Sequence, residues 1–177
     1  MRNGEFFEKD SPNDRWNDMK NIFNIKDFEW QKKSSDDAPI IFVLQPSDNW
    51  SMNGLEPIEW FNDVYKKLRP LTKRKFIARP HPNHAQAMYD KRDKFPADVE
   101  LMIPQKQFSG DEKKNYRFHF QTALNDCHAV VTHNSTASVD SCIRGIPTFV
   151  TSDLAICYPV ANTDLSKIES PEFPDRT

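Results

Sequence analysis

The stretch from residue 128 to residue 147 most constrains the fold of this chain. A short apolar run, Ala129 to Val131, is followed by five consecutive polar residues, and a segment compatible with a helix then runs until Gly145 and Pro147. A glycine just past the last turn and a proline beyond it are common signals that end a helix. The stretch therefore predicts a strand, a polar loop and a helix, in that order.

The polar loop carries hydroxyl and amide side chains where the predicted helix, residues 136–144, begins. The side chains of Asn134, Ser135 and Thr136 could cap the N–H groups of its first turn, or share those N–H groups with an anion. Asp140 follows one turn later and has three open roles: to hold the loop by hydrogen bonds, to orient a ribose, or to face water.

The rest of the chain alternates strands with helices. The strand predicted at residues 39–44 is apolar at every position, as expected when helices cover both faces of a sheet. Further strands are predicted at 75–79, 99–103, 129–131 and 148–150, and further helices at 57–68, 85–93 and 115–127. This alternation predicts an α/β fold, a three-layer Rossmann-like parallel sheet with helices on both faces.

The 177 residues are enough for one domain with a substantial core. Residues 1–37 are rich in Asn, Asp, Lys and Glu with scattered aromatics, so we expect an irregular N-terminal arm that packs over the domain, with a short helix near 14–24. The alternative is the remnant of a larger N-terminal unit. Residues 38–177 are predicted to form the Rossmann-like domain. Its loop-rich tail, from about residue 152, is expected to cross back over the sheet with a turn of helix at 153–156.

Composition argues against several classes of function. The formal net charge of −2 gives no broad basic field, which argues against tight non-specific binding of nucleic acid. No apolar run approaches the roughly 20 residues that span a bilayer, and the first residues do not resemble a signal peptide, so we expect a cytoplasmic protein without a membrane span. The three cysteines form no C-x-x-C pair and are expected to be small buried residues. No histidine pair with a carboxylate has the spacing of metal ligands, so no metal site is expected.

Three polar clusters are expected to converge, because the carboxyl ends of parallel strands lie at one edge of the sheet. They are Gln45 to Ser51, the pair Arg79 and His81, and His133 to Thr136. N–H donors at a helix start, hydroxyls and a nearby cation are the groups that bind phosphate. With four glycines the chain has neither a G-x-G-x-x-G motif nor a Walker loop, so such a site would be built from Ser and Thr.

His81 lies between Pro80 and Pro82, which fix the backbone and aim the imidazole ring. This arrangement suits an anion contact or proton transfer near neutral pH, or alternatively a rigid surface turn. His133 has the same two interpretations. A Ser–His–Asp hydrolase fits poorly, because the G-x-S-x-G elbow is missing around Ser135.

These motifs together resemble a known family. The strand that ends in Arg79 to Pro82, followed later by a strand, Asn134 to Thr136, a helix and Gly145 to Pro147, resembles the nucleotide-binding half of GT-B glycosyltransferases over about residues 39–150. The resemblance is to the bacterial capsule polysaccharide and teichoic-acid group. That group includes sialyl-, Kdo- and glycerophosphotransferase-like proteins and small relatives encoded by phages.

The resemblance implies a function and a site. In that group the His-Pro motif and the serine-rich helix start contact the phosphates of the donor. Here those roles would fall on His81, Ser135 and Thr136, with Arg79 as a supporting cation and His81 as the candidate catalytic residue. The full set of expected donor-phosphate contacts is Arg79, His81, Asn134, Ser135 and Thr136, and the expected supporting residues are His133, Asp140, Gln45 and Ser51.

The implied substrate is a CMP-, UDP- or GDP-linked sugar, transferred to a glycan or another acceptor, with no further cofactor. A complete GT-B enzyme has two Rossmann-like domains with the active site between them. A homodimer partner, a second domain or another subunit would therefore have to complete the cleft. The alternatives are a non-catalytic nucleotide- or glycan-binding module, which could serve as a subunit of a larger transferase, and a sugar-nucleotide epimerase or hydrolase.

Overall fold

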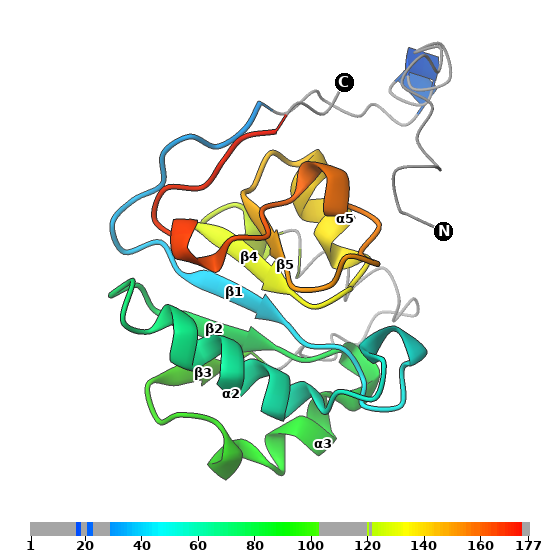
Figure 1. Ribbon diagram of the computed structural model, residues 1–177, viewed down its shortest axis with the longest axis vertical. Coiled ribbons are helices and arrows are strands. Elements are labelled where there is room, and N and C mark those ends of the chain that lie inside the picture. The colour runs from blue at the N-terminus through cyan, green and yellow to red at the C-terminus, as the bar shows by residue number, and fades with distance from the viewer. Residues whose placement is uncertain (1–16, 19–20, 23–28, 103–119, 121, 175–177) are drawn as a thin grey trace.

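The computed structural model describes residues 17–18, 21–22, 29–102, 120 and 122–174, and shows one open sheet of five parallel strands (Figure 1). The strand order is β3-β2-β1-β4-β5. The strands are β1 (Ile40–Val43), β2 (Phe76–Arg79), β3 (Val99–Leu101), β4 (Ala129–Thr132) and β5 (Thr148–Val150). The predicted α/β fold with a Rossmann-like parallel sheet is confirmed.

Helices lie between successive strands and, as short 3-10 helices, after the last strand. They are α2 (Pro57–Leu68), α3 (Ala85–Tyr89) and α5 (Ala137–Ile143), with short 3-10 helices η2 (Trp50–Met52), η3 (Pro82–His84), η4 (Arg92–Lys94), η5 (Tyr158–Val160) and η6 (Leu165–Lys167). The predicted bounds of α2 are confirmed, because a proline opens it and apolar residues recur at helical spacing. The helix expected over 85–93 instead divides into α3 and η4. Of the helix expected over 115–127, Phe120 and residues 122–124 are helical, and residues 115–119 and 121 lie outside the described residues.

The prediction of a turn of helix at 153–156 is wrong. The side chains there alternate between inside and outside: Ala155 and Cys157 are buried, whereas Leu154 and Ile156 are 58% and 63% exposed. A helical turn does not alternate in this way. The segment forms turns instead, and the 3-10 helix η5 comes later. Of the helix expected near 14–24, residues 17–18 and 21–22 are helical and the rest lies outside the described residues.

The core has two halves because side chains alternate across each strand. One half lies between the sheet and α2, where the Phe42 ring contacts Phe61 and Phe76 at centroid distances of 4.7 and 5.2 Å. On the other face Ile41 packs with Leu124 and their neighbours. Burying one such large apolar side chain contributes about 1.5–3 kcal/mol, so both faces of β1 stabilise the fold.

The direction in which successive strands are added to the sheet reverses between β1 and β4. From β1 the chain adds β2 and β3 on one side, and then returns to add β4 and β5 on the other. In open α/β sheets ligands bind outside the carboxyl ends of the strands at such a switch point. The loops that leave β1 and β4 there, residues 44–56 and 133–136, therefore frame the candidate site.

The segment before β1 and the C-terminal tail run side by side (Figure 1, blue and red). The indole N–H of Trp30 donates to the carbonyl of Pro174 at 2.8 Å, and the backbone N–H of Gln31 donates to the carbonyl of Gly145 at 2.7 Å. Gly145 has a φ of +73°, and a Cβ there would lie 2.0 Å from the carbonyl oxygen of Glu29. A glycine at this position is therefore required both by its backbone conformation and by the close approach of the arm.

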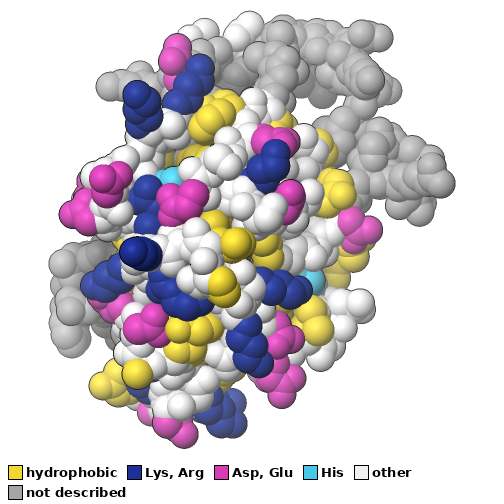
Figure 2. All heavy atoms as spheres, turned by 60° about the vertical axis from the view of Figure 1, so that its left-hand side comes forward, with side chains coloured by type: hydrophobic (Ala, Val, Ile, Leu, Met, Phe, Trp, Pro, Cys, Tyr) yellow, Lys and Arg dark blue, Asp and Glu magenta, His cyan; other side chains and the backbone are white. Residues whose placement is uncertain are grey.

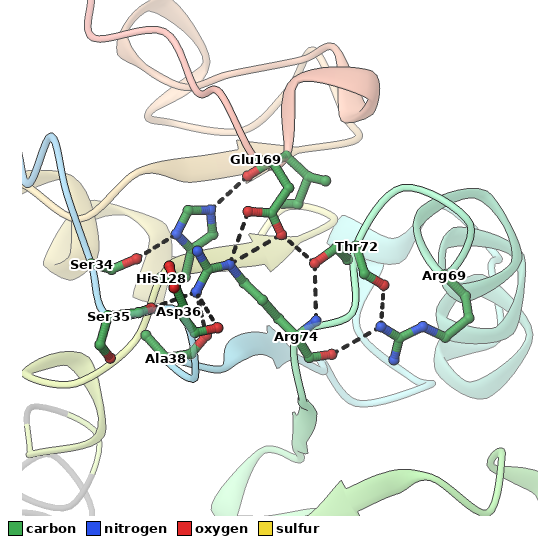
Figure 3. A network of polar contacts seen from close by, with 10 residues as sticks. Ser34, Ser35, Asp36, Ala38, Arg69, Thr72, Arg74, His128 and Glu169 are labelled. Atoms are coloured by element: carbon green, nitrogen blue, oxygen red, sulfur yellow. Dashed lines mark hydrogen bonds and ion pairs between the residues drawn. The ribbon is translucent and has the colours of Figure 1, made fainter.

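A network of charged and polar groups closes the amino edge of the sheet, where the strands begin (Figure 3). The guanidinium of Arg74 holds both carboxylate oxygens of Glu169 at 3.1 Å. Its Nη1 donates to the carbonyls of Ser35, Asp36 and Ala38 at 2.6, 3.2 and 3.1 Å. One side chain thus joins the entry to β2, the segment before β1 and the tail.

His128 extends this network to the start of β4. Its Nδ1 is 2.7 Å from the Ser34 hydroxyl, and its Nε2 is 2.7 Å from the carbonyl of Ile168. The carbonyl can only accept, so Nε2 carries the hydrogen and the Ser34 hydroxyl donates to Nδ1. Figure 2, in which this side of the molecule turns toward the viewer, shows acidic and basic side chains interspersed rather than a field of one sign.

The described residues contain no helix long and apolar enough to cross a bilayer. All three cysteines are buried, as expected.

Candidate functional site at the carboxyl edge

Gln45 joins the two loops at the switch point. Its Oε1 accepts from the N–H of Asn134 at 3.0 Å, and its Nε2 donates to the carbonyl of the same residue at 3.1 Å and to the Ser51 hydroxyl. A side-chain amide is suited to this double contact because it carries both an acceptor and donors. Gln45 is 7% exposed. The structure thus brings the first and third polar clusters together through a buried neutral clamp.

Ser135 rather than Thr136 caps the start of α5. Its Oγ accepts from the N–H of Ala137 at 3.3 Å, and its carbonyl accepts from the N–H of Ser138 at 3.0 Å. Thr136 makes no side-chain capping bond, so of the three side chains that could cap the helix it is Ser135 that does so. The reason is conformational: Thr136 has φ −61° and ψ −17°, which is helical, whereas a capping side chain usually reaches forward from an extended residue to the N–H groups of the first turn.

This capping changes what the loop can offer to a ligand. The amides of Ala137, Ser138 and Val139 already bond within the chain, the last to the carbonyl of Thr136 at 3.0 Å. The hydroxyl of Ser135 is half-buried and the side chain of Thr136 is exposed. In this conformation the loop therefore presents hydroxyl groups to a ligand, rather than the N–H groups of residues 137–139.

Arg79 lies at the same level of the sheet as the two loops. Val43, the last residue of β1, pairs with Arg79 on one side and with Thr132 on the other. By the alternation of side chains, Arg79 lies on the face that α5 covers, and its guanidinium lies 4.7 Å from the centroid of the Phe120 ring. Arg79 is 6% exposed, and burial lowers its pKa to about 10, which leaves it charged at neutral pH. The result is a fixed cation beside the switch point.

His81 follows two residues later and is exposed. Its Nδ1 accepts from the N–H of Asn83 at 3.3 Å, so in the neutral ring the hydrogen sits on Nε2. Burial, His84 and Arg79, in that order, lower the pKa of His81. Near neutral pH the ring is therefore uncharged and offers Nε2–H as a donor, while its basic nitrogen is engaged with the backbone.

His133 lies on the opposite face of the sheet from Arg79. Its Nδ1 is 2.9 Å from the hydroxyl oxygen of Thr151, which also accepts from the indole N–H of Trp60 at 2.8 Å. Burial lowers the pKa of His133. Sequence reasoning missed Trp60 and Thr151; the available signal was a tryptophan on the inner face of α2, because a buried indole N–H needs an acceptor. The structure places His133 in a packing contact with α2, apart from the Arg79 face.

Two further residues complete the description of this edge. Asp140 is half-buried in α5, and the three roles considered for its side chain stay predictions. Trp50, which the sequence did not single out, is 86% exposed on η2 next to Ser51 of the clamp, so its indole ring faces solvent beside the site. Among the described residues, no three His, Cys, Asp or Glu side chains gather closely enough to hold a metal ion.

The parallel sheet and its switch point define a Rossmann-like α/β fold. A similar solved structure is that of Thermosulfurimonas dismutans KpsC, a beta Kdo 2,4 transferase, with a TM-score of 0.56 and 12% sequence identity. The similarity covers 93% of this chain and 56% of the KpsC chain, so this chain spans about half of that protein. At this identity the similarity is one of fold. No protein-family model matches the chain, and no curated protein sequence matches it.

Proposed function

We propose that the protein binds a nucleotide-activated sugar at the carboxyl edge of the sheet and transfers the sugar to a glycan or another acceptor. One observation carries the proposal: Arg79 is a buried, charged side chain level with the ends of β1 and β4, on the face that α5 covers. A fixed cation beside the switch point suits a ligand that brings negative charge to that place. The fold shared with KpsC supports a sugar nucleotide as that ligand.

Each residue of the edge has a distinct task in this proposal. Arg79 supplies the positive charge, His81 donates from Nε2, and the hydroxyls of Ser135 and Thr136 contact the donor phosphates. Gln45 fixes the distance between the two loops. Transfer is promoted because these groups stabilise the negative charge that grows on the departing phosphate. His81 acts as a hydrogen-bond donor in this scheme, since its Nδ1 is engaged with Asn83.

Calorimetric titration with CMP-, UDP- and GDP-linked sugars tests the proposal. We expect one nucleotide class to bind, and we expect Arg79→Met to weaken that binding by about tenfold or more, or about 1.4 kcal/mol or more. Lys66→Met is the matched control, because it also removes a cation but from the exposed side of α2, where Lys66 is 75% exposed. Circular dichroism should confirm that both variants are folded. Absence of binding by all three donor classes would refute the proposal, as would equal losses in the two variants.

A non-catalytic nucleotide-binding module is the second candidate. It is favoured by the single Rossmann-like sheet of the described residues, since the resemblance places the active site of GT-B enzymes between two such domains. Incubation of the bound donor with candidate acceptors separates the two. Release of free nucleotide only when an acceptor is present indicates transfer, and binding without release indicates the module. Release without any acceptor would indicate an epimerase or hydrolase.

A further inference from the structure

Two of the three cysteines lie together in the folded protein. Cys142 belongs to α5 and Cys157 to the segment after β5, and both are 4% exposed in one buried cluster with Val150 and Ala155. The two thiols hydrogen-bond with each other, and the Cys157 thiol also contacts the hydroxyl of Ser138. A pair of sulfur atoms in contact across two separate elements is an arrangement that can be oxidised to a disulfide.

The third cysteine provides an internal contrast. Cys127 packs in a different cluster on the Leu124 side of the sheet, and its Sγ donates to the carbonyl of Leu124 at 3.5 Å. Burial raises the pKa of Cys127 to about 12. The hydrogen bond with Cys142, with a further contribution from Ser138, lowers the pKa of Cys157 to about 7. Because the thiolate is the reactive form, the two buried cysteines should differ sharply in reactivity near neutral pH.

We propose that Cys142 and Cys157 form a reversible disulfide when the protein meets a peroxide, joining the last turns of α5 to the segment after β5. The Cys157 thiolate attacks one peroxide oxygen, the O–O bond breaks, and the leaving hydroxide takes up a proton to become water. The Cys142 thiol then attacks the sulfenic sulfur, loses its proton and expels a second water. Two thiols and one hydrogen peroxide thus give one disulfide and two waters, with two electrons passing to the peroxide.

Ser138 links this pair to the loop at the start of α5. Its hydroxyl has one hydrogen, which it donates to the carbonyl of Ser135 at 2.5 Å. A Cys157 thiolate competes for that hydrogen, whereas a disulfide sulfur is a much weaker acceptor. Oxidation therefore favours the bond to Ser135 and tightens the first turn of the helix. This inference does not depend on the identity of any donor bound there.

The test is oxidation of the native protein with a small excess of hydrogen peroxide near pH 7, followed by alkylation under denaturing conditions and peptide mapping by mass spectrometry. We expect a loss of two hydrogen atoms, one cross-linked peptide pair that contains Cys142 and Cys157, and a fully alkylated Cys127. A thiol reductant should restore the starting mass. The rate of cross-link formation should rise with pH through the region near 7, because the fraction of Cys157 present as thiolate rises there.

The variants separate this result from non-specific oxidation. Cys127→Ala should form the same cross-link, and Cys142→Ala and Cys157→Ala should not form it. If either of those two fails to fold, the peptide map of the unaltered protein still decides. Three thiols that all remain alkylatable, a cross-link that involves Cys127, or a Cys157 that proceeds to sulfinic acid without pairing would each overturn the proposal.

Discussion

The two edges of the sheet are held together by different chemistry. At the amino edge, Arg74 and Glu169 form a charged network with backbone carbonyls from the segment before β1 (Figure 3). At the carboxyl edge, Gln45 joins Asn134 and Ser51 through neutral groups. The charges of Arg74 and Glu169 thus neutralise each other. The contacts of Gln45 hold two loops together without any charged group. Under the proposed function, the amino edge stabilises the fold, whereas the carboxyl edge would bind the ligand.

The largest expected effect is at the amino edge. Arg74→Met removes the ion pair with Glu169 and leaves the carbonyls of Ser35, Asp36 and Ala38 without that donor. We expect the free energy of unfolding to fall by about 2–3 kcal/mol, because the Arg74 side chain is 10% exposed and loses its bonds to Glu169 and to three carbonyls at once, although Glu169 itself is 41% exposed. Urea denaturation followed by circular dichroism measures this loss.

Lys66→Met is the control for Arg74→Met. It breaks an ion pair with Asp63 whose side chains are 75% and 72% exposed, and it should change the unfolding free energy by less than about 0.5 kcal/mol. If the two variants lose equal stability, the network at the amino edge is no more than a set of surface ion pairs, and the contrast between the edges fails.

A smaller loss of stability is expected at the carboxyl edge. Gln45→Met keeps the approximate volume of the side chain but removes its hydrogen bonds to Asn134 and Ser51. The free energy of unfolding should fall by about 1–2 kcal/mol. The affinity of the folded protein for any nucleotide sugar should also fall, beyond the loss of folded protein. Gln86→Met is the matched control, because Gln86 bonds Asp90 on an exposed surface. A Gln45→Met protein with full stability and altered binding, or the reverse, would show which of the two tasks the clamp performs.

The order of the elements and the proximity of the two loops after β1 and β4 can be predicted from the sequence. The apolar run of β1 and the spacing in α2 are local patterns, and a parallel sheet by itself predicts that residues after β1 and β4 lie close together. Side-chain alternation along β4 would also have placed His133 with Val131, on the face away from Arg79. The period of two thus extends one residue past the end of β4.

Other features depend on contacts that no local pattern encodes. Arg74 and Glu169 are 95 residues apart, and their pairing depends on where the tail returns to the sheet. The contact of Cys142 with Cys157 depends on the same tail, so cysteine spacing could not reveal it. Residue type left Asn134, Ser135 and Thr136 as equal candidates to cap α5, and the backbone conformation gives that role to Ser135.

The smallest expected effect compares the edges through their histidines. Burial is the first cause that lowers the pKa of His128 at the amino edge and of His133 at the carboxyl edge. When the folded pKa lies below the unfolded value of about 6.5, the unfolded chain binds more protons in the interval between them. Stability should therefore be nearly constant above pH 7 and fall as the pH drops through 6.5.

Urea midpoints measured between about pH 5 and pH 8 give this slope, and the variants His128→Asn and His133→Asn assign it to one edge or the other. Each replacement should flatten part of the curve. His128 contacts Ser34 and a backbone carbonyl within the charged network, so its protonation also alters the field at Arg74 and Glu169. His133 contacts the neutral pair Thr151 and Trp60. If only His133→Asn flattens the plot of stability against pH, the pH response belongs to the carboxyl edge. Protonation of His128 would then have no effect on the stability of the charged network, contrary to our expectation.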